Sequence, residues 1–490
     1  MATLFTPYST ITGLSGTVTG TSNAVPTWVP WIIDQERVFS YQAYEEIFWG
    51  IPDTFKLVSR GSEDKPIYLP SGRKIVEACD RYVGKNFSWQ CSDPNGQLFF
   101  DALFAREAFL SQFQGNKLYG IIRGDWCWHI TANPLKPAGS RITIRAMDPG
   151  SYFPIFDPND VDRVIGCHIV ELIAVGDETQ VKRLTYRKTD VGITSEIAMF
   201  ALDDWGEADS SPVQIIQPVT ALPPLITALP VYHVKNFLEP QNPFGSSEMR
   251  GLERIISALN QSISDEDLTL AMDGLGMYAT NATAVDEDGD AAEWDIGPAK
   301  VVELKGTKSE VFFDRIQGVG SVTPFQDHLR YLDEWLMQGS GTPDVATGKV
   351  DVTVAESGVA LLLQMGPIIA KAEKKDTLLL DTHNQMLYDL LNGWAPAYEG
   401  VRLPEGTTLT ASVGDKMPFN RKQRFDELLA MLSAKVIDTQ YFRDEMSKIG
   451  YQFPADIAQR VQTESQILVD PVSARLSADL AAETDRGFSS

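Results

Sequence analysis

A long amphipathic helix is the strongest constraint on the fold of this chain. The stretch NPFGSSEMRGLERIISALNQSISDEDLTLAMDGLG begins at Asn242 with turn residues and offers Ser246 as a helix N-cap. One stripe of apolar residues follows at helical spacing: Met249, Leu252, Ile255, Ile256, Leu259 and Ile263. The pattern predicts a helix of about 28 residues and about 40 Å, ended by Gly274 and Gly276. A stripe of this length needs a partner to cover it.

A second helix is predicted close behind the first. Thr323 is an N-cap with Pro324 in the first helical position, and Gly339 and Gly341 follow its last residue, Gln338. The segment between the two helices has strand-like runs, VVEL and EVFFDRI, around the acidic VDEDGDAAEWD. We therefore expect a small β insertion between two helices.

A third helical stretch begins at the capping-box pattern TVAE, from Thr353 to Glu356. Gly366 and Pro367 lie inside it, and we expect a kink or break there because proline lacks the backbone donor. The strand-like GTTLTASV comes next. Short helices are then predicted in FNRKQRFDELLAMLSAKVIDTQYFRDEMSKIGY, ahead of a polar tail.

The N-terminal half reads as a mixed α+β body. Helices are predicted in WIIDQERVFSYQAYEEIFWGIP, in RKIVEACDRYVGKNF and, as one helix, in GQLFFDALFAREAFLSQFQ, followed by the strand-like YGIIRGDWCWHITA. From Arg141 to about Ala201, short β-rich runs separated by Asp, Gly and Pro clusters predict antiparallel strands.

Composition limits the possible functions. A net charge of −24 argues against tight, static binding to nucleic acid, because that affinity comes largely from Lys and Arg. Four widely spaced cysteines without a CxxC pair suit a reducing compartment and buried thiols. No charge precedes Asp34, no signal peptide is recognised, and no apolar run is long enough to span a bilayer. We expect a soluble protein that is intracellular when made.

The stretch GTPDVATGKV, from Gly341 to Val350, looks like a phosphate-binding loop but departs from that pattern. Six residues instead of four separate Gly341 from Gly348, and Val350 stands where a magnesium-binding hydroxyl is needed. The preceding residues have helical spacing, whereas such a loop follows a strand. We therefore interpret the stretch as an interhelical loop that does not bind nucleotide.

Other candidate sites are weaker. The run DEDGD, Asp286 to Asp290, lacks the spacing of a calcium-binding loop, and we leave open a solvated hairpin or an acidic docking patch. The five histidines have no metal-ligand spacing and are interpreted as satisfied polar side chains. Three lysines in the third helical stretch either contact DNA or another subunit or are simply solvated: Lys371, Lys374 and Lys375.

The order of these parts resembles the portal proteins of tailed bacteriophages. VYHVKNFLEPQNPFGSSEMRGLERIISALNQSISD is similar to the portal segment that enters the first stem helix, and ESGVALLLQMGPIIAKAEKK to the helix after the tunnel loop. YEEIFWGIPDTFKLVSRGSEDKPIYLPSGRKIVEA resembles portals of phages infecting actinobacteria. The resemblance covers most of the chain, except the uncharged N-terminus and the tail after about Val469.

The resemblance implies an α+β portal-type fold with a mixed wing, helical stem, small β-containing clip, kinked tunnel helix and helical crown. Along the chain these parts are an N-terminal arm (1–30), wing (31–245), stem helix 1 (246–276), clip (277–322), stem helix 2 (323–339), tunnel loop (340–352), kinked helix (353–394), a strand returning to the wing (395–418), crown (419–467) and polar tail (468–490).

Two sets of site residues follow from the resemblance. The tunnel loop is expected to touch DNA in the channel through Thr342, Pro343, Asp344, Val345, Ala346, Thr347, Gly348 and Lys349. The acidic clip is expected to be a docking surface formed by Asp286, Glu287, Asp288, Asp290, Glu293 and Asp295. No catalytic residue, metal or cofactor is implied.

The implied function is a ring of about twelve subunits at one capsid vertex, closed by cyclic symmetry, through which the genome is packaged, retained and ejected. Expected partners are double-stranded DNA, the terminase large subunit, a neck or adaptor protein, and the major capsid and scaffolding proteins, without a membrane. The expected location is the portal vertex of the virion, and the host cytoplasm during assembly. Alternatives are another capsid or head–tail adaptor protein, or a nucleotide hydrolase.

Overall fold

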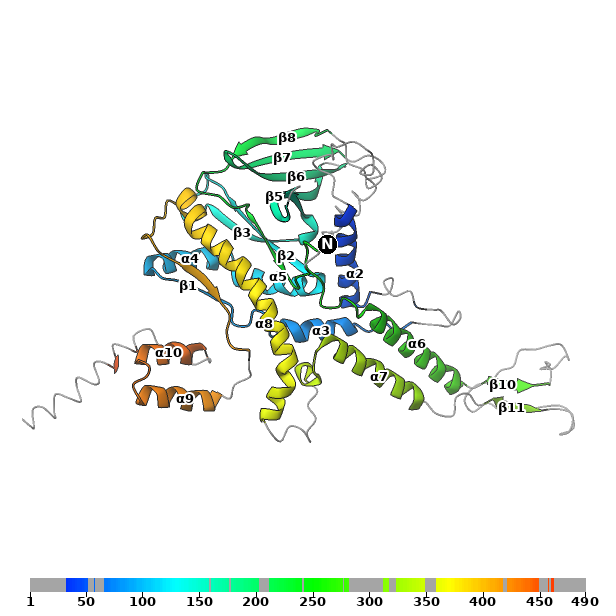
Figure 1. Ribbon diagram of the computed structural model, residues 1–490. Coiled ribbons are helices and arrows are strands. Elements are labelled where there is room, and N and C mark those ends of the chain that lie inside the picture. The colour runs from blue at the N-terminus through cyan, green and yellow to red at the C-terminus, as the bar shows by residue number, and fades with distance from the viewer. Residues whose placement is uncertain are drawn as a thin grey trace, which may run out of the picture. The chain divides into compact units, whose positions relative to one another are not determined.

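The computed structural model describes residues 32–51, 57, 66–157, 160–175, 178–201, 211–239, 242–275, 277–281, 312–316, 323–348, 358–416, 421–448, 457, 460 and 461 (Figure 1). The chain divides into two compact units, Met1–Lys416 and Met417–Ser490. Helices and strands are mixed in the first unit, in agreement with the expected α+β class.

The first unit begins with helices and one short strand. They are α2 (Ile32–Trp49), α3 (Ser71–Asp80), β1 (Ser88–Cys91), α4 (Pro94–Arg106) and α5 (Phe109–Arg123). The single helix predicted over GQLFFDALFAREAFLSQFQ is wrong, because the chain breaks between α4 and α5. Ala108 adopts a left-handed conformation there, with φ of 50°. The adjacent Glu107 is buried and accepts a hydrogen bond from the backbone N–H of Ile144, which helps to hold the break.

Antiparallel strands follow, as predicted. A three-stranded sheet has the order β3-β2-β9, formed by β2 (Asp125–Ala132), β3 (Ile142–Met147) and β9 (Val231–Lys235). After the 3₁₀ turn η3 (Pro149–Ser151), a five-stranded sheet runs in sequence order through β4 (Tyr152–Asp157), β5 (Asp160–Val175), β6 (Glu178–Thr189), β7 (Gly192–Ala201) and β8 (Gln214–Ala221). Sequential neighbours of this kind need only hairpin connections.

Two elements far apart in sequence complete the body. The strand predicted in GTTLTASV is β12 (Leu409–Ser412), which pairs antiparallel with β1 in a register that sets Cys91 opposite Leu409 and Ser88 opposite Ser412. The core is aromatic around Trp128, which stacks on Phe109 with ring centroids 4.6 Å apart. All four cysteines are free and buried, as expected.

The first long helix starts later than predicted. It is α6 (Glu253–Leu275), so Ser246 is not its N-cap. Gly251 has a φ of +85°, which interrupts the helical path, and the hydroxyl of Ser246 instead donates to Glu239 at 2.6 Å. The strands β10 (Met277–Thr280) and β11 (Phe313–Ile316) then pair antiparallel, and α7 (Thr323–Ser340) follows, close to its predicted limits.

The third helix is not broken at its proline. It is α8 (Gly358–Asp389), with Pro367 inside it, and a π-helical segment η5 (Leu390–Glu399) continues it. Proline at position 367 leaves the carbonyl of Leu363 without its helical donor. Leu363 is 75% exposed, so water can satisfy that carbonyl. The capping-box residues Thr353 and Glu356 lie outside the described residues.

Among its described residues, the second unit has two helices, α9 (Arg421–Ser433) and α10 (Thr439–Lys448). Leu428 and Met446 are buried between these helices, and Phe425 and Phe442 pack beside them. This agrees with the short helices predicted in this region.

Candidate functional site at the connection between α7 and α8

The connection after α7 is a short 3₁₀ turn, η4 (Asp344–Thr347). Glycines with positive φ flank it, Gly341 at +63° and Gly348 at +91°. The backbone N–H of Thr342 donates to the carbonyl of Met337 at 3.1 Å, which closes the end of α7. A helix therefore precedes this segment, as the sequence predicted, and not the strand that a phosphate-binding loop requires.

The turn is packed against the body. Ala346 is buried together with Ala78 of α3 and Met365, Ile368 and Ile369 of α8. Arg81, directly after α3, donates from Nη1 to the carbonyl of Ala346 at 3.1 Å. These contacts place the turn against two helices on its inner side.

The eight residues expected to touch DNA are thus in different environments. Thr342 and Ala346 are buried, so their side chains are not available to DNA in this conformation. Pro343, Val345 and Thr347 are half-buried, whereas Asp344 and Gly348 are exposed. Lys349 lies outside the described residues. Contact with DNA therefore stays a prediction, and among the described positions it now applies to the exposed and half-buried ones.

A buried ion-pair cluster lies next to this connection. Glu248 Oε1 lies 2.6 Å from Nζ of Lys371, and its Oε2 pairs with Nζ of Lys375. Lys375 also donates to Asn236 Oδ1 at 2.7 Å and lies 4.1 Å from the centre of the Phe237 ring. Burial alone would raise the pKa of the Glu248 carboxyl, but the ammonium groups of Lys375 and Lys371 outweigh it and hold the pKa below its usual value.

This cluster changes the interpretation of the lysines in the third helical stretch. Lys375 is buried, and Lys371 is half-buried and also donates to the carbonyl of Ser340 at the end of α7. Both bind Glu248 within the subunit, and of the three only Lys374 is exposed. No local pattern pointed to Glu248 as their partner, because it lies 123 positions from Lys371 and 127 positions from Lys375 along the chain.

A second buried carboxylate, Asp125, holds the chain segment that leads towards α6. It accepts hydrogen bonds from the Tyr41 hydroxyl, from Nε2 of His233 at 2.5 Å, and from the backbone N–H of Gly245 at 2.7 Å. His129 and His168 likewise have polar partners, the hydroxyls of Tyr186 and Thr185. These histidines are satisfied polar side chains, as interpreted from the sequence.

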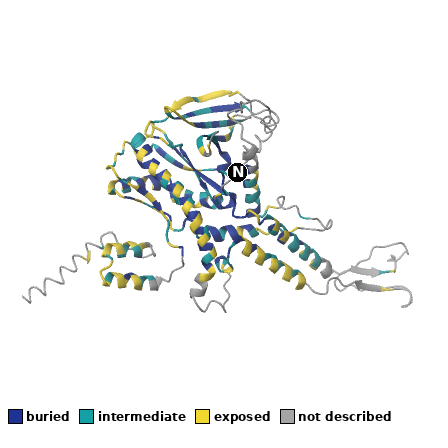
Figure 2. Ribbon diagram, viewed as in Figure 1, coloured by how far each residue is buried: buried dark blue, intermediate teal, exposed yellow. Residues whose placement is uncertain are grey.

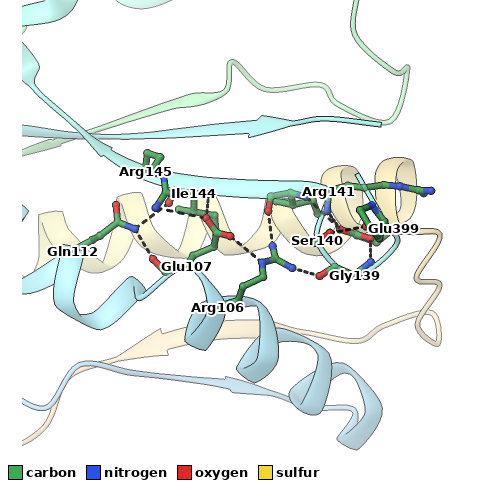
Figure 3. Close-up of polar contacts among 11 residues, drawn as sticks. Arg106, Glu107, Gln112, Gly139, Ser140, Arg141, Ile144, Arg145 and Glu399 are labelled. Carbon is green, nitrogen blue, oxygen red and sulfur yellow. Dashed lines mark hydrogen bonds and ion pairs between the residues drawn. The ribbon is translucent and has the colours of Figure 1, made fainter. Parts of the chain in front are cut away.

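A third polar cluster fixes the loop between β2 and β3 (Figure 3). The carboxylate of Glu399, at the end of η5, accepts hydrogen bonds from the backbone N–H of Arg141, at 2.7 Å, and from the backbone N–H of Gly139. Arg106 donates to the carbonyls of Gly139 and Ile142 from the other side. Adjacent backbone N–H groups of this kind suit an anion, but here a carboxylate of the chain itself occupies them, so the cluster is a structural junction.

Within the described ranges, no group of three His, Cys, Asp or Glu residues is placed to hold a metal ion. No described helix is long and apolar enough to cross a membrane. The acidic residues from Asp286 to Asp295 lie outside the described residues, so the docking patch stays a prediction.

Comparison with known proteins gives structural neighbours only. No protein-family model and no curated protein matches the chain. A chain in the solved structure "Virion of native gene transfer agent (GTA) particle" has a TM-score of 0.42 and 13% identity, covering 89% of this chain and 99% of that one. A chain from "Neck of native GTA particle computed with C12 symmetry" has a TM-score of 0.41 and 13% identity, with coverages of 77% and 89%. A chain from "Neck of empty GTA particle computed with C6 symmetry" has a TM-score of 0.42 and 14% identity, with coverages of 88% and 98%.

Proposed function

We propose that this protein is a phage portal subunit, which assembles into a ring around a DNA channel at one capsid vertex. The observation that carries the proposal is the path of the chain from α6 to α7. The chain leaves the body along α6, forms the antiparallel pair β10–β11, and returns along α7 to the turn η4 and then α8. This order supports the stem, clip, tunnel loop and tunnel helix that the sequence resemblance implies.

The proposed roles follow the same order. The two helices α6 and α7 form the stem, the segment 277–322 forms the clip that docks the terminase large subunit and later a neck protein, and η4 lies at the tunnel loop. The helices α9 and α10 belong to the crown. The protein itself performs no catalysis and needs no cofactor in this proposal.

The acidic composition is compatible with a channel through which DNA slides. Affinity for a DNA backbone grows with the number of phosphates that Lys and Arg neutralise. The described part of the tunnel loop contains Asp344 and no lysine or arginine, and Lys371 and Lys375 nearby share the carboxylate of Glu248, which cancels one of their two positive charges. A surface of this kind holds a moving polyanion weakly.

Averaged electron micrographs of the purified protein test the proposal. We expect closed rings of about twelve copies with an axial channel, because cyclic symmetry closes a repeated head-to-tail contact. A protein that stays monomeric or dimeric at every concentration would contradict it. Rings or sheets without an axial channel would favour a capsid or adaptor protein, and ATP turnover lost in Lys349→Ala would favour a hydrolase.

A further inference from the structure

The last strand of the five-stranded sheet, β8, is an edge that carries exposed apolar side chains. The sheet has the order β4-β5-β6-β7-β8, so among the described strands β8 pairs with β7 alone. Figure 2 shows β8 as an exposed margin of this sheet. Ile215 and Ile216 are each 53% exposed. Neighbouring side chains of a strand point to opposite faces, so β8 presents apolar surface on both faces of the sheet.

This edge lacks the usual protection against pairing with another strand. A sheet edge presents backbone N–H and C=O groups that can bind a further strand, and proteins often block such pairing with charged residues or proline. The run Val213–Gln217, VQIIQ, contains neither, and Pro212 and Pro218 bound it. Val213 belongs to the ladder, because its backbone N–H donates to the carbonyl of Met199 at 2.8 Å. A window of five residues is therefore open to one more strand.

The segment before α2 matches this edge in chemistry. Of the segments longer than six residues outside the described ranges, 1–31 is the only one without a charged side chain. It contains the run Tyr8–Thr12, YSTIT, which is rich in strand-forming residues and is bounded by Pro7 and Gly13. The segment 202–210, LDDWGEADS, lies closer to β8 in the sequence but carries four carboxylates. Pairing with YSTIT would cover the exposed isoleucines without burying a charge.

The position of α2 brings this segment within reach of β8. Arg37 of α2 donates from Nη1 to the carbonyl of Pro149 at 2.7 Å and from Nη2 to that of Tyr152 at 2.8 Å, so α2 lies at the start of β4. Strands of a sheet are about 4.8 Å apart, which puts a strand added beyond β8 about 24 Å from β4. Residues 13–31 can span up to about 60 Å when extended. The connection is long enough to cross the sheet.

We propose that Tyr8–Thr12 pairs with Val213–Gln217 of the same copy, as a sixth strand of this sheet. In strand addition of this kind, main-chain hydrogen bonds provide affinity and alternate side chains provide specificity. Because the segment is covalently attached, its effective concentration at β8 is of millimolar order, well above that of another copy. The inference concerns a contact within the subunit and does not depend on the proposed ring.

Cross-linking tests the pairing. Thr10 and Ile215 are the central residues of the two runs, so they lie opposite each other in a parallel or an antiparallel pair that uses both runs fully. A short thiol cross-linker should join the two positions in Thr10→Cys/Ile215→Cys, because Cβ atoms of opposite residues are about 4.5–5.5 Å apart. The four native cysteines are buried and should not react. Mass spectrometry of the digested protein should find the two peptides linked, while a denaturing gel shows monomers.

A matched control moves one thiol to the turn between β6 and β7. Val191 is 82% exposed there. Ile215 lies opposite Ala198, and residue 191 is about 23 Å from Ala198 along β7, so Thr10→Cys/Val191→Cys should not cross-link.

Several results would overturn the inference. One is the absence of the link between positions 10 and 215, and another is equal linking in the control. Covalent dimers of Thr10→Cys/Ile215→Cys would show that the added strand comes from another copy. Dimers of Ile215→Cys alone would show that β8 meets β8. Either kind of dimer rejects pairing within one copy.

Hydrogen exchange gives a second measurement without engineered thiols. Ile11→Pro removes a backbone donor from the middle of YSTIT and should prevent strand pairing. The amides of Val213–Gln217 that do not face β7 should then exchange at least about tenfold faster than in the wild type. The control Asn23→Pro lies outside the paired run and should leave this exchange unchanged. Equal exchange in the wild type and in Ile11→Pro would overturn the inference.

Discussion

The indole N–H of Trp128 donates to Nε2 of His383 across 3.0 Å, and this bond joins β2 to α8 inside the core. Nδ1 of the same imidazole lies 2.7 Å from the carbonyl of Leu379, so it carries the proton and His383 is neutral. Burial lowers the pKa of His383 to about 4. It also lowers the pKa of His129 to about 4 and that of His168 to about 3.

These three histidines predict a loss of stability in mild acid. Folding lowers each pKa, so the unfolded chain binds protons first as the pH falls below about 6.5. Between pH 6.5 and pH 5, protonation of each imidazole in the unfolded chain should lower the free energy of unfolding by about 1.6 kcal/mol. Denaturant unfolding at both pH values measures this. In His383→Gln, whose amide preserves a donor and an acceptor, the loss should be about one third smaller, and an unchanged loss would contradict the assignment.

The cluster at Glu248 predicts that losing a buried ion pair lowers the free energy of unfolding far more than losing an exposed one. Glu248→Gln leaves the buried ammonium of Lys375 without its counter-charge and should destabilise the protein by about 3–5 kcal/mol. The control Glu334→Gln removes the exposed partner of Arg330 on α7 and should cost about 0–1 kcal/mol. Chemical denaturation compares the two variants. Similar midpoints would mean that the cluster is not as buried as the structure shows.

The turn η4 predicts that neighbouring positions respond differently to substitution. Ala346→Asp places a carboxylate among Ala78, Met365 and Ile368 and should cost at least about 3 kcal/mol. Asp344→Asn changes an exposed position and should stay within about 0.5 kcal/mol. Thermal unfolding of the two variants checks this, and equal effects would show that the turn is not packed as described.

The acidic segment of the proposed clip predicts a docking defect without an assembly defect. Replacing Asp286, Glu287, Asp288 and Asp290 by their amides should leave rings intact and weaken association with the packaging motor, most of all at low ionic strength. Binding measured at several salt concentrations tests this. The control neutralises two exposed acidic residues of the five-stranded sheet region, Glu171 and Asp190. Binding that is unchanged at every ionic strength would mean that the run is only a solvated hairpin.

Local signals in the sequence predicted several elements well. The N-cap and proline at Thr323 and Pro324, with Gly341 at the other end, located α7 almost to the residue. The antiparallel strands after Arg141 were also predictable, because their period-2 patterns and short turns are local properties.

Features that depend on distant contacts were not predictable. The predicted start of α6 was wrong. Ser246 is a residue type that often caps helices, but the positive φ of Gly251 interrupts the helical path and α6 begins only at Glu253. The sequence predicted the connection Gly341–Gly348 only as an interhelical loop. Its packing could not be foreseen, because the hydrogen bond from Arg81 to Ala346 joins residues 265 positions apart in the chain. A deletion of Asp344–Thr347 is expected to destabilise the subunit because it removes the buried Ala346.

The pairing of β1 with β12 has a consequence for synthesis. The hydroxyls of Ser88 and Ser412 are 3.0 Å apart, yet 324 positions separate these residues along the chain. At 5–20 residues per second, a ribosome needs roughly 15–65 seconds to make that interval. Throughout this time β1 lacks its partner strand β12, although the aromatic residues near β1 in the sequence have already been synthesised. The body of the protein therefore closes late, after residue 412 has left the ribosome, and its nascent form exposes an unpaired strand that chaperones are suited to protect.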